Sequence, residues 1–142
     1  MTVRASMWWL AVIWFAGGGF LFVILVGQSL TGYYEPRTQD AWGWFLPTVM
    51  PTLALIVGAL VADYRKVVIG GQDAPKLSAG PVFWLGAGLS VFYLLVVASS
   101  ILLQPLLSET SPLVLMQRSN LWLGPLQGLC VAALGFFFQS KT

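Results

Sequence analysis

MWWLAVIWFAGGGFLFVILVGQSL, residues 7–30, contains no charged side chain. A helix that crosses a membrane needs about 20 mostly apolar residues, because each residue adds about 1.5 Å across a hydrocarbon core of about 30 Å. The stretch is therefore long enough to cross a bilayer as one helix. Its apolar residues are continuous rather than alternating, which argues against a transmembrane β-strand. Arg4 before the run is also compatible with a signal peptide, but the run exceeds the usual apolar core of such peptides, so we expect a retained helix.

Three further apolar segments follow, at 44–62, 82–103 and 121–138. We expect the second helix to continue to residue 66. The fourth is expected to start at residue 112, because Ser111-Pro112 is a typical helix start. All seven basic and five acidic residues lie outside the four apolar segments, and charged residues make up only 8% of the chain, against about 25% in soluble domains. The sequence predicts a single all-α transmembrane domain over residues 1–142, a four-helix bundle with helices at about 7–30, 44–66, 82–103 and 112–138.

The distribution of lysine and arginine predicts the orientation of this bundle. Cytoplasmic segments of membrane proteins carry an excess of these residues. Five of them fall on one side of the four predicted spans and two on the other. The five are Arg4, Arg65, Lys66, Lys76 and Lys141, and the two are Arg37 and Arg118. We therefore expect both chain ends in the cytoplasm and a multi-pass protein of a bacterial cytoplasmic (inner) membrane.

The residue types that carry most chemistry are scarce. The chain has no histidine and one cysteine, Cys130, so the usual metal ligands and general bases are missing. No Asp, Glu, Lys, Arg or His lies within the apolar segments, which disfavours proton-coupled transport. A net charge of +2 without a basic block disfavours nucleic acid as a partner. We expect no enzyme activity and no cofactor; a membrane enzyme acting on lipid is a minor alternative.

Small residues recur every four positions on two of the predicted helices. Small residues on one helical face let two backbones approach closely within a membrane, where burying large apolar side chains against each other gains little. The repeats predict helix-packing or oligomer interfaces, within one chain or between chains, unless the spacing arose by chance. The two ladders are Ala54, Gly58 and Ala62, and Gly124, Gly128 and Ala132.

Prolines and one amide mark the parts of these helices that face the predicted outer side. Pro51 has no N–H for the carbonyl of Pro47, so the second helix should bend there, with Thr48 and Thr52 bonding the freed backbone groups. Pro125 should bend the fourth helix, and the two bends are candidates for a gate. Alternatively, these prolines simply start helices. Gln127 is expected to form an interhelical hydrogen bond or to face a pore.

The predicted inner loop, residues 63–81, begins with Asp63, followed by Tyr64, Arg65 and Lys66. These residues form a candidate docking surface for a soluble cytoplasmic partner, although the two cations are also sufficient to fix the topology. The opposite loop is expected at residues 31–43.

Two functional hypotheses remain from the sequence. In the first, the protein forms a homo-oligomeric, pore- or channel-like or membrane-perturbing assembly. In the second, it is an anchor or accessory subunit that recruits or stabilises another protein in a membrane complex. In both, the lipid bilayer is the surrounding medium and helix association, not catalysis, performs the function.

Overall fold

The structure, a computed structural model, describes residues 3–70, 80–107 and 110–139. It contains α1 (Val3–Leu30), α2 (Thr38–Gly70), α3 (Pro81–Leu102) and α4 (Pro112–Gln139), and a short 3-10 helix, η1 (Gln104–Leu106). No strand occurs in these ranges. Each of the four α-helices is long and apolar enough to cross a membrane, which confirms the predicted all-helical, four-helix architecture and suggests a multi-pass membrane protein. The charged residues Asp73, Lys76, Glu109 and Lys141 lie outside the described residues.

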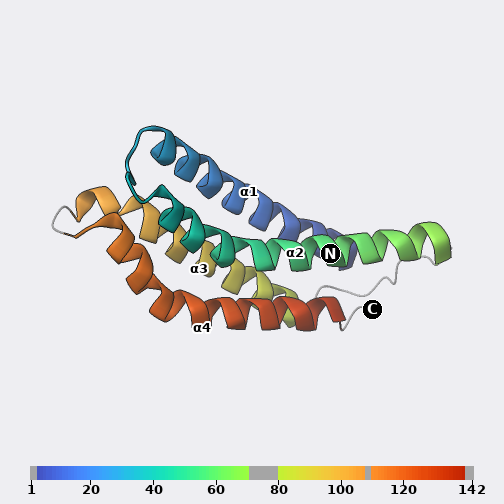
Figure 1. Cartoon of the computed structure of the whole chain (residues 1–142). Helices are drawn as coiled ribbons and strands as arrows, with labels where there is room; N and C mark the ends of the chain where they lie inside the picture. The colour runs from blue at the N-terminus through green and yellow to red at the C-terminus, as the bar shows by residue number, and fades with distance from the viewer. Residues whose placement is uncertain (1–2, 71–79, 108–109, 140–142) are drawn as a thin grey trace.

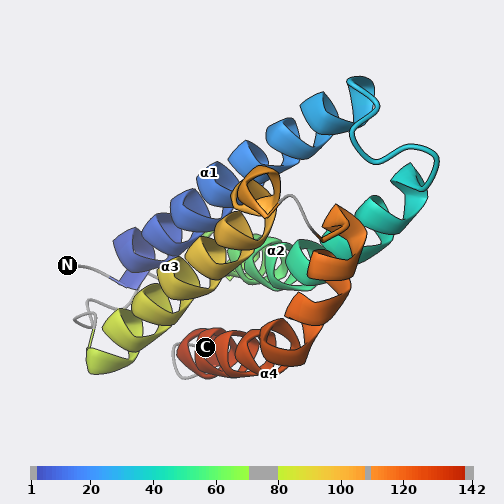
Figure 2. The ribbon, with the colours of Figure 1, turned by 90° about the vertical axis from the view of Figure 1, so that its left-hand side faces the viewer.

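The helices form two antiparallel hairpins packed on each other (Figures 1 and 2). The first, α1 and α2, is joined by the loop at residues 31–37, and α3 and α4 form the second. Contacts run between α1 and α3 and between α2 and α4 as well as within each hairpin. We call the end with the loop 31–37 and η1 the loop end, and the opposite end, where α2 stops at Gly70, the tip end. α1 begins and α4 ends at the tip end.

The boundary between α1 and α2 is set by a glycine turn. The N–H of Tyr33 donates to the carbonyl of Gln28, and the N–H of Gly32 donates to that of Ser29. This pair of hydrogen bonds is the Schellman arrangement, which needs a residue with positive φ after the helix. Gly32 supplies it, with φ +71°. The chain then re-enters a helix at Thr38, so the loop is shorter than the predicted 31–43.

α2 is longer at both ends than the sequence analysis predicts. It runs from residue 38 instead of 44 and continues to Gly70 instead of 66. Its 33 residues correspond to about 50 Å, against about 33 Å for the 22 residues of α3. Figure 1 shows the last turns of α2 projecting past the other three helices. Helix is favoured there because α2 runs without Gly or Pro from Ala59 to Ile69.

Both α2 and α4 change direction partway along their length (Figures 1 and 2). Both contain internal prolines, Pro47 and Pro51 in α2 and Pro125 in α4, and remain helical through them. An internal proline removes one helical hydrogen bond, and its ring displaces the preceding turn, which bends the helix. The bends give the bundle its curved outline.

Close helix packing inside the bundle relies on glycines other than those of the two ladders. A Cβ added at Gly17 would lie 2.8 Å from Leu94 Cδ1 of α3, and one at Gly18 would lie 3.2 Å from Val49 Cγ1 of α2. The middle of α1 therefore lies close to side chains of both neighbours, and a larger residue at either glycine would require Leu94 or Val49 to shift. The sequence analysis did not single out these two glycines.

Candidate functional site

One group of interhelical polar contacts lies where the bends of α2 and α4 meet. Pro51 has no N–H, so the carbonyl of Pro47 loses its partner within α2. Gln127 Nε2 of α4 donates to this carbonyl oxygen at 2.9 Å and lies 3.1 Å from the carbonyl oxygen of Thr48. The amide of Gln127 therefore replaces the donor that Pro51 removes. The sequence analysis expected Gln127 either to form an interhelical hydrogen bond or to face a pore. The structure contains the interhelical hydrogen bond.

A second side chain reaches the same backbone from α3. The phenolic hydroxyl of Tyr93 donates to the carbonyl of Thr48 at 2.8 Å, and the ring of Tyr93 packs on Trp14 of α1 with centroids 5.7 Å apart. Both aromatic side chains are buried. We call the carbonyls of Pro47 and Thr48, with their donors Gln127 and Tyr93, the proline junction. All four helices meet around it.

The two threonines expected to satisfy the freed carbonyl have other roles. The hydroxyl of Thr48 donates to the carbonyl of Trp44 at 2.6 Å. The hydroxyl of Thr52 is fully buried and has no hydrogen-bond partner in the structure. The sequence analysis was therefore wrong about which side chain donates a hydrogen bond to the freed carbonyl of Pro47. The donor, Gln127, lies on a different helix, α4. A donor across a helix interface ties the bend of α2 to α4, whereas a threonine within α2 would leave the two helices independent.

Polar contacts also join the helices nearer the loop end. Tyr34, in the loop, lies with its hydroxyl 2.7 Å from Gln28 Oε1 and 3.1 Å from Gln104 Oε1, so it links α1 to η1. Burial, followed by the neighbouring Tyr33, raises the pKa of the Tyr34 phenol above its ordinary value, so the hydroxyl stays protonated and donates. The indole N–H of Trp42 donates to Ser29 at 3.0 Å.

A similar contact links α2 to α4: Trp44 Nε1 donates to Ser119 Oγ at 3.1 Å. Aromatic, amide and hydroxyl side chains thus join the loop, η1, α1, α2 and α4 at or near the loop end. The sequence analysis did not identify this network. Its signal was present, because Gln28, Gln104 and Ser119 are polar residues at the ends of apolar segments.

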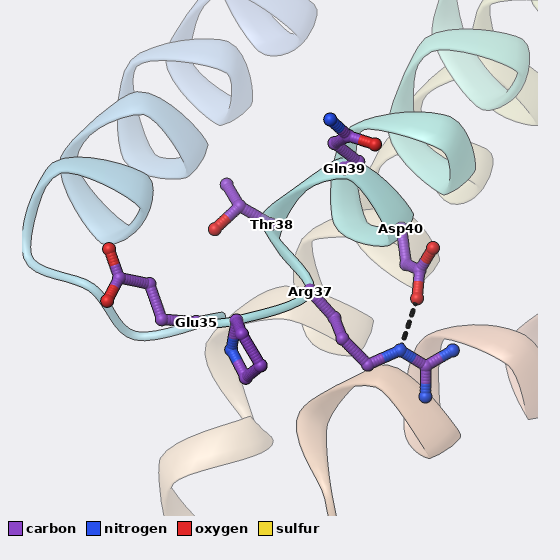
Figure 3. Close-up of a pocket in the computed structure, with 6 residues that line it drawn as sticks. Glu35, Arg37, Thr38, Gln39 and Asp40 are labelled. Carbon is purple, nitrogen blue, oxygen red and sulfur yellow. Dashed lines mark ion pairs between the residues drawn. The ribbon is translucent and has the colours of Figure 1, made fainter.

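A polar concavity with a volume of about 690 Å³ lies on the surface of the loop end (Figure 3). Its lining is the short segment Glu35, Pro36, Arg37, Thr38, Gln39 and Asp40. Arg37 Nε and Asp40 Oδ2 form an ion pair at 2.6 Å, and the Glu35 carboxylate lies apart from them. No cluster of three metal-ligating side chains occurs among residues 3–70, 80–107 and 110–139. The concavity therefore offers exposed charges, but no assembled ligand set.

Both small-residue ladders lie on the outside of the bundle. Ala54, Gly58 and Ala62 of α2 are exposed, as are Gly124, Gly128 and Ala132 of α4. A Cβ built at Gly58, Gly124 or Gly128 would meet no atom of the chain within 4 Å. The ladders are therefore not used for packing between the four helices of one chain.

Tyr64, Arg65 and Lys66 lie in the last turns of α2, as the helix predicted to continue to residue 66 requires, and their assignment to the inner loop is wrong. The side chains of Tyr64 and Arg65 are exposed. Arg4, at the start of α1, forms an ion pair of 3.6 Å with Asp63, so contact between α1 and α2 reaches the turn just before Tyr64. The exposed turns that follow form a helical projection.

Comparison of the chain with models of protein families, with curated proteins and with solved structures gives no match. The arrangement of residues is therefore the basis for inferring function. The contacts described above are non-covalent. Inside the bundle, amide and hydroxyl groups donate hydrogen bonds to backbone carbonyls, and the small residues of the two ladders are exposed on its surface.

Proposed function

We propose that this chain is a bacterial inner-membrane protein with both ends in the cytoplasm, and that it acts as a homo-oligomeric, pore-like assembly. Arg4 and Arg65 lie at the tip end, whereas Arg37 and Arg118 lie at or near the loop end. With Lys66, Lys76 and Lys141 of the sequence, the excess of positive charge favours a cytoplasmic tip end.

The observation that carries the proposal is the exposure of both ladders. Within lipid, helices associate by close backbone approach and dispersion contact, for which small residues are suited. If the ladders packed the helices of a single chain against each other, they would lie between those helices. Instead, both ladders are exposed, one on α2 and one on α4. A neighbouring copy is the partner that can use both.

The proline junction supplies the element that opens. Gln127 connects the bent part of α2 to α4 through carbonyls that α2 itself leaves available. Loss of this connection and of the Trp44–Ser119 hydrogen bond lets the loop-end parts of α2 and α4 separate without breaking any backbone hydrogen bond of either helix. A pore of this kind needs no ring of charged side chains, because a hydrophobic constriction is sufficient as a gate.

The proposal is tested with purified protein in liposomes that contain a self-quenched dye. We expect the unaltered protein to form oligomers and release dye. Gly58→Leu and Gly128→Leu should abolish both, because leucine keeps the backbones of two copies apart. Leu129→Phe is the matched control, since it enlarges the exposed neighbour of Gly128 on the same helix and should preserve both properties. Loss of oligomers with leakage intact would contradict the proposal.

A second candidate function is supported by the projection of α2. Exposed Tyr64 and Arg65 stand clear of the bundle on a helix, a surface on which a soluble protein can dock. In this alternative the chain is an anchor or accessory subunit. It predicts sealed liposomes with the purified chain and a second polypeptide that co-purifies from mildly solubilised membranes. Tyr64→Ala with Arg65→Ala should remove that polypeptide and leave the bundle intact.

A further inference from the structure

Two buried polar groups in the middle of the bundle have no hydrogen-bond partner. They are the indole N–H of Trp14 in α1 and the hydroxyl of Thr52 in α2, and both residues are 0% exposed. No other buried side-chain nitrogen or oxygen is unpaired within residues 3–70, 80–107 and 110–139. A buried polar group without a partner is destabilising by its full cost of desolvation, so both groups need an explanation.

The two groups lie at the same level of the bundle. α1 and α2 run antiparallel (Figure 1), and a Cβ added at Gly18 would lie 3.2 Å from Val49 Cγ1 and 3.9 Å from Leu53 Cδ1. One turn from Gly18 toward the tip end, α1 reaches Trp14. One turn from Val49 in the same direction, α2 reaches Leu53, the residue after Thr52. The two unpaired groups therefore lie on adjacent helices at equal depth.

Tyr93 of α3 contacts both positions. Its ring packs on Trp14, with centroids 5.7 Å apart, and its hydroxyl donates to the carbonyl of Thr48 at 2.8 Å. In an α-helix this carbonyl points toward the residue four positions on, which is Thr52. The Tyr93 hydroxyl therefore lies beside Thr52, while the Tyr93 ring lies against Trp14. We call Trp14, Thr52 and Tyr93 the Trp14–Thr52 site.

The proline junction explains why Thr52 has no partner within its own helix. A threonine hydroxyl in a helix commonly donates to the carbonyl four residues before it, here that of Thr48. That carbonyl accepts a hydrogen bond from Tyr93 and lies 3.1 Å from Gln127 Nε2, so two side chains already occupy it. The indole N–H of Trp14 can only donate, and it meets no acceptor. Both groups thus need a partner that the described residues do not supply.

We infer that the Trp14–Thr52 site binds one water molecule, which links α1, α2 and α3. The water oxygen accepts hydrogen bonds from the Trp14 indole and the Thr52 hydroxyl. One water hydrogen is donated to the phenolic oxygen of Tyr93, whose own hydrogen is donated to Thr48. About three hydrogen bonds to buried groups are typical of internal waters. A single small ligand that both accepts and donates accounts for both unpaired groups, whereas a cation or an apolar molecule does not.

The water completes the contacts of α2 at the proline junction. Each of the other three helices then has a hydrogen-bonded link to this part of α2. These links are made by Gln127 from α4, by Tyr93 from α3 and, through the water, by Trp14 from α1. The site lies within one chain, so the inference does not depend on oligomers, on a pore or on an anchored partner.

The sign of one substitution tests the inference. Thr52→Val removes the hydroxyl and keeps the shape of the side chain. We expect it to shift the unfolding equilibrium of the purified protein, titrated with a denaturing detergent, about fivefold toward the unfolded state, the effect of one lost hydrogen bond. Thr48→Val is the matched control, because the Thr48 hydroxyl has a known partner, the Trp44 carbonyl at 2.6 Å, and should give a shift of similar size. If Thr52→Val gives no shift, or a shift toward the folded state, the hydroxyl is unpaired and the inference is overturned.

A second measurement detects the water itself by nuclear magnetic resonance. The indole nitrogens of the seven tryptophans are labelled with nitrogen-15, and the Trp14 signal is the one that Trp14→Phe removes. We expect a nuclear Overhauser contact between the Trp14 indole proton and a water molecule that tumbles with the protein. Thr52→Ala should keep this contact, because alanine leaves room for the water and has no hydroxyl proton that exchanges with solvent.

Two results of this measurement contradict the inference. The first is the absence of a water contact at Trp14 in the unaltered protein. The second is a contact that disappears in Thr52→Ala, which would assign the Thr52 hydroxyl itself as the neighbour of the indole. If Trp14→Phe does not fold, the direction of the Thr52→Val shift decides alone.

Discussion

The loop end and the tip end of this bundle are held together by different kinds of contact. At and near the loop end, side chains donate hydrogen bonds from one element to another, as Tyr34, Trp44 and Gln127 do. The tip end is packed by aromatic and aliphatic side chains, including Phe83 against Phe137 with ring centroids 6.1 Å apart. Hydrogen bonds have fixed partners and directions, whereas apolar contacts depend on shape alone.

This difference has a consequence for movement. Hydrogen bonds between helices in a membrane contribute only about 0.6 kcal/mol on average, with a maximum near 1.7. A conformational change can exchange them one at a time for bonds to water. Packed aromatic rings at the tip end cannot be separated without opening a cavity. We therefore expect the loop end to open and the tip end to stay assembled.

The largest effect should come from truncating the packing at the tip end. Phe137 is buried, whereas its neighbour Phe136 is 62% exposed. Phe137→Ala should lower the free energy of unfolding by about 3 kcal/mol, at the low end of the range for soluble cores because lipid would replace water as the reference in the proposed membrane protein. Phe136→Ala is the matched control and should change it by less than about 0.5 kcal/mol. Titration with a denaturing detergent measures both; equal effects would show that the tip end is not the packed region.

A smaller effect is expected at the proline junction. Gln127→Leu should cost about 1 kcal/mol, because it leaves the Pro47 carbonyl without a donor. Gln117→Leu, at an exposed position of the same helix, is the control.

A double-mutant cycle that combines Gln127→Leu with Pro51→Ala tests more specifically whether Gln127 replaces the donor that Pro51 removes. Pro51→Ala restores an N–H to α2 that can bond the Pro47 carbonyl, so Gln127→Leu should then cost close to nothing. Additive effects in the same detergent titration would mean that Gln127 does not compensate for Pro51.

The sequence predicted much of this arrangement, for identifiable reasons. The four helices follow from apolar length, because a charge-free run such as residues 7–30 has few alternatives. The carbonyl freed by Pro51 was also predictable from covalent structure alone. Its donor was not, because Gln127 lies 80 residues away and only the packing of α2 on α4 brings the two together.

Other features were missed because their signals depend on tertiary context. The start of α2 at Thr38 follows from the Gly32 turn, which shortens the loop and places Trp42 within reach of Ser29. The packing glycines of α1, Gly17 and Gly18, lack the four-residue spacing that drew attention to the ladders. The four-residue spacing of small residues identified helix faces of α2 and α4 that are exposed. The face of α1 that packs inside the chain through Gly17 and Gly18 has no such repeat of small residues.

The smallest expected effect concerns the ion pair at the tip end, and it tests whether charge contributes to holding α1 on α2. Arg4 and Asp63 are 3.6 Å apart, with 45% and 29% of their side chains exposed. Ion pairs this accessible contribute about 0.5 kcal/mol, since water and salt screen them. Arg4→Ala should therefore lower the free energy of unfolding by about that amount, and 1 M salt should remove the difference. Asp63→Asn should show the same loss, and the double variant should be no worse than either single one. A loss above about 2 kcal/mol that persists in salt would mean that the pair is shielded from water, and the tip end would then depend on a directional contact much as the loop end does.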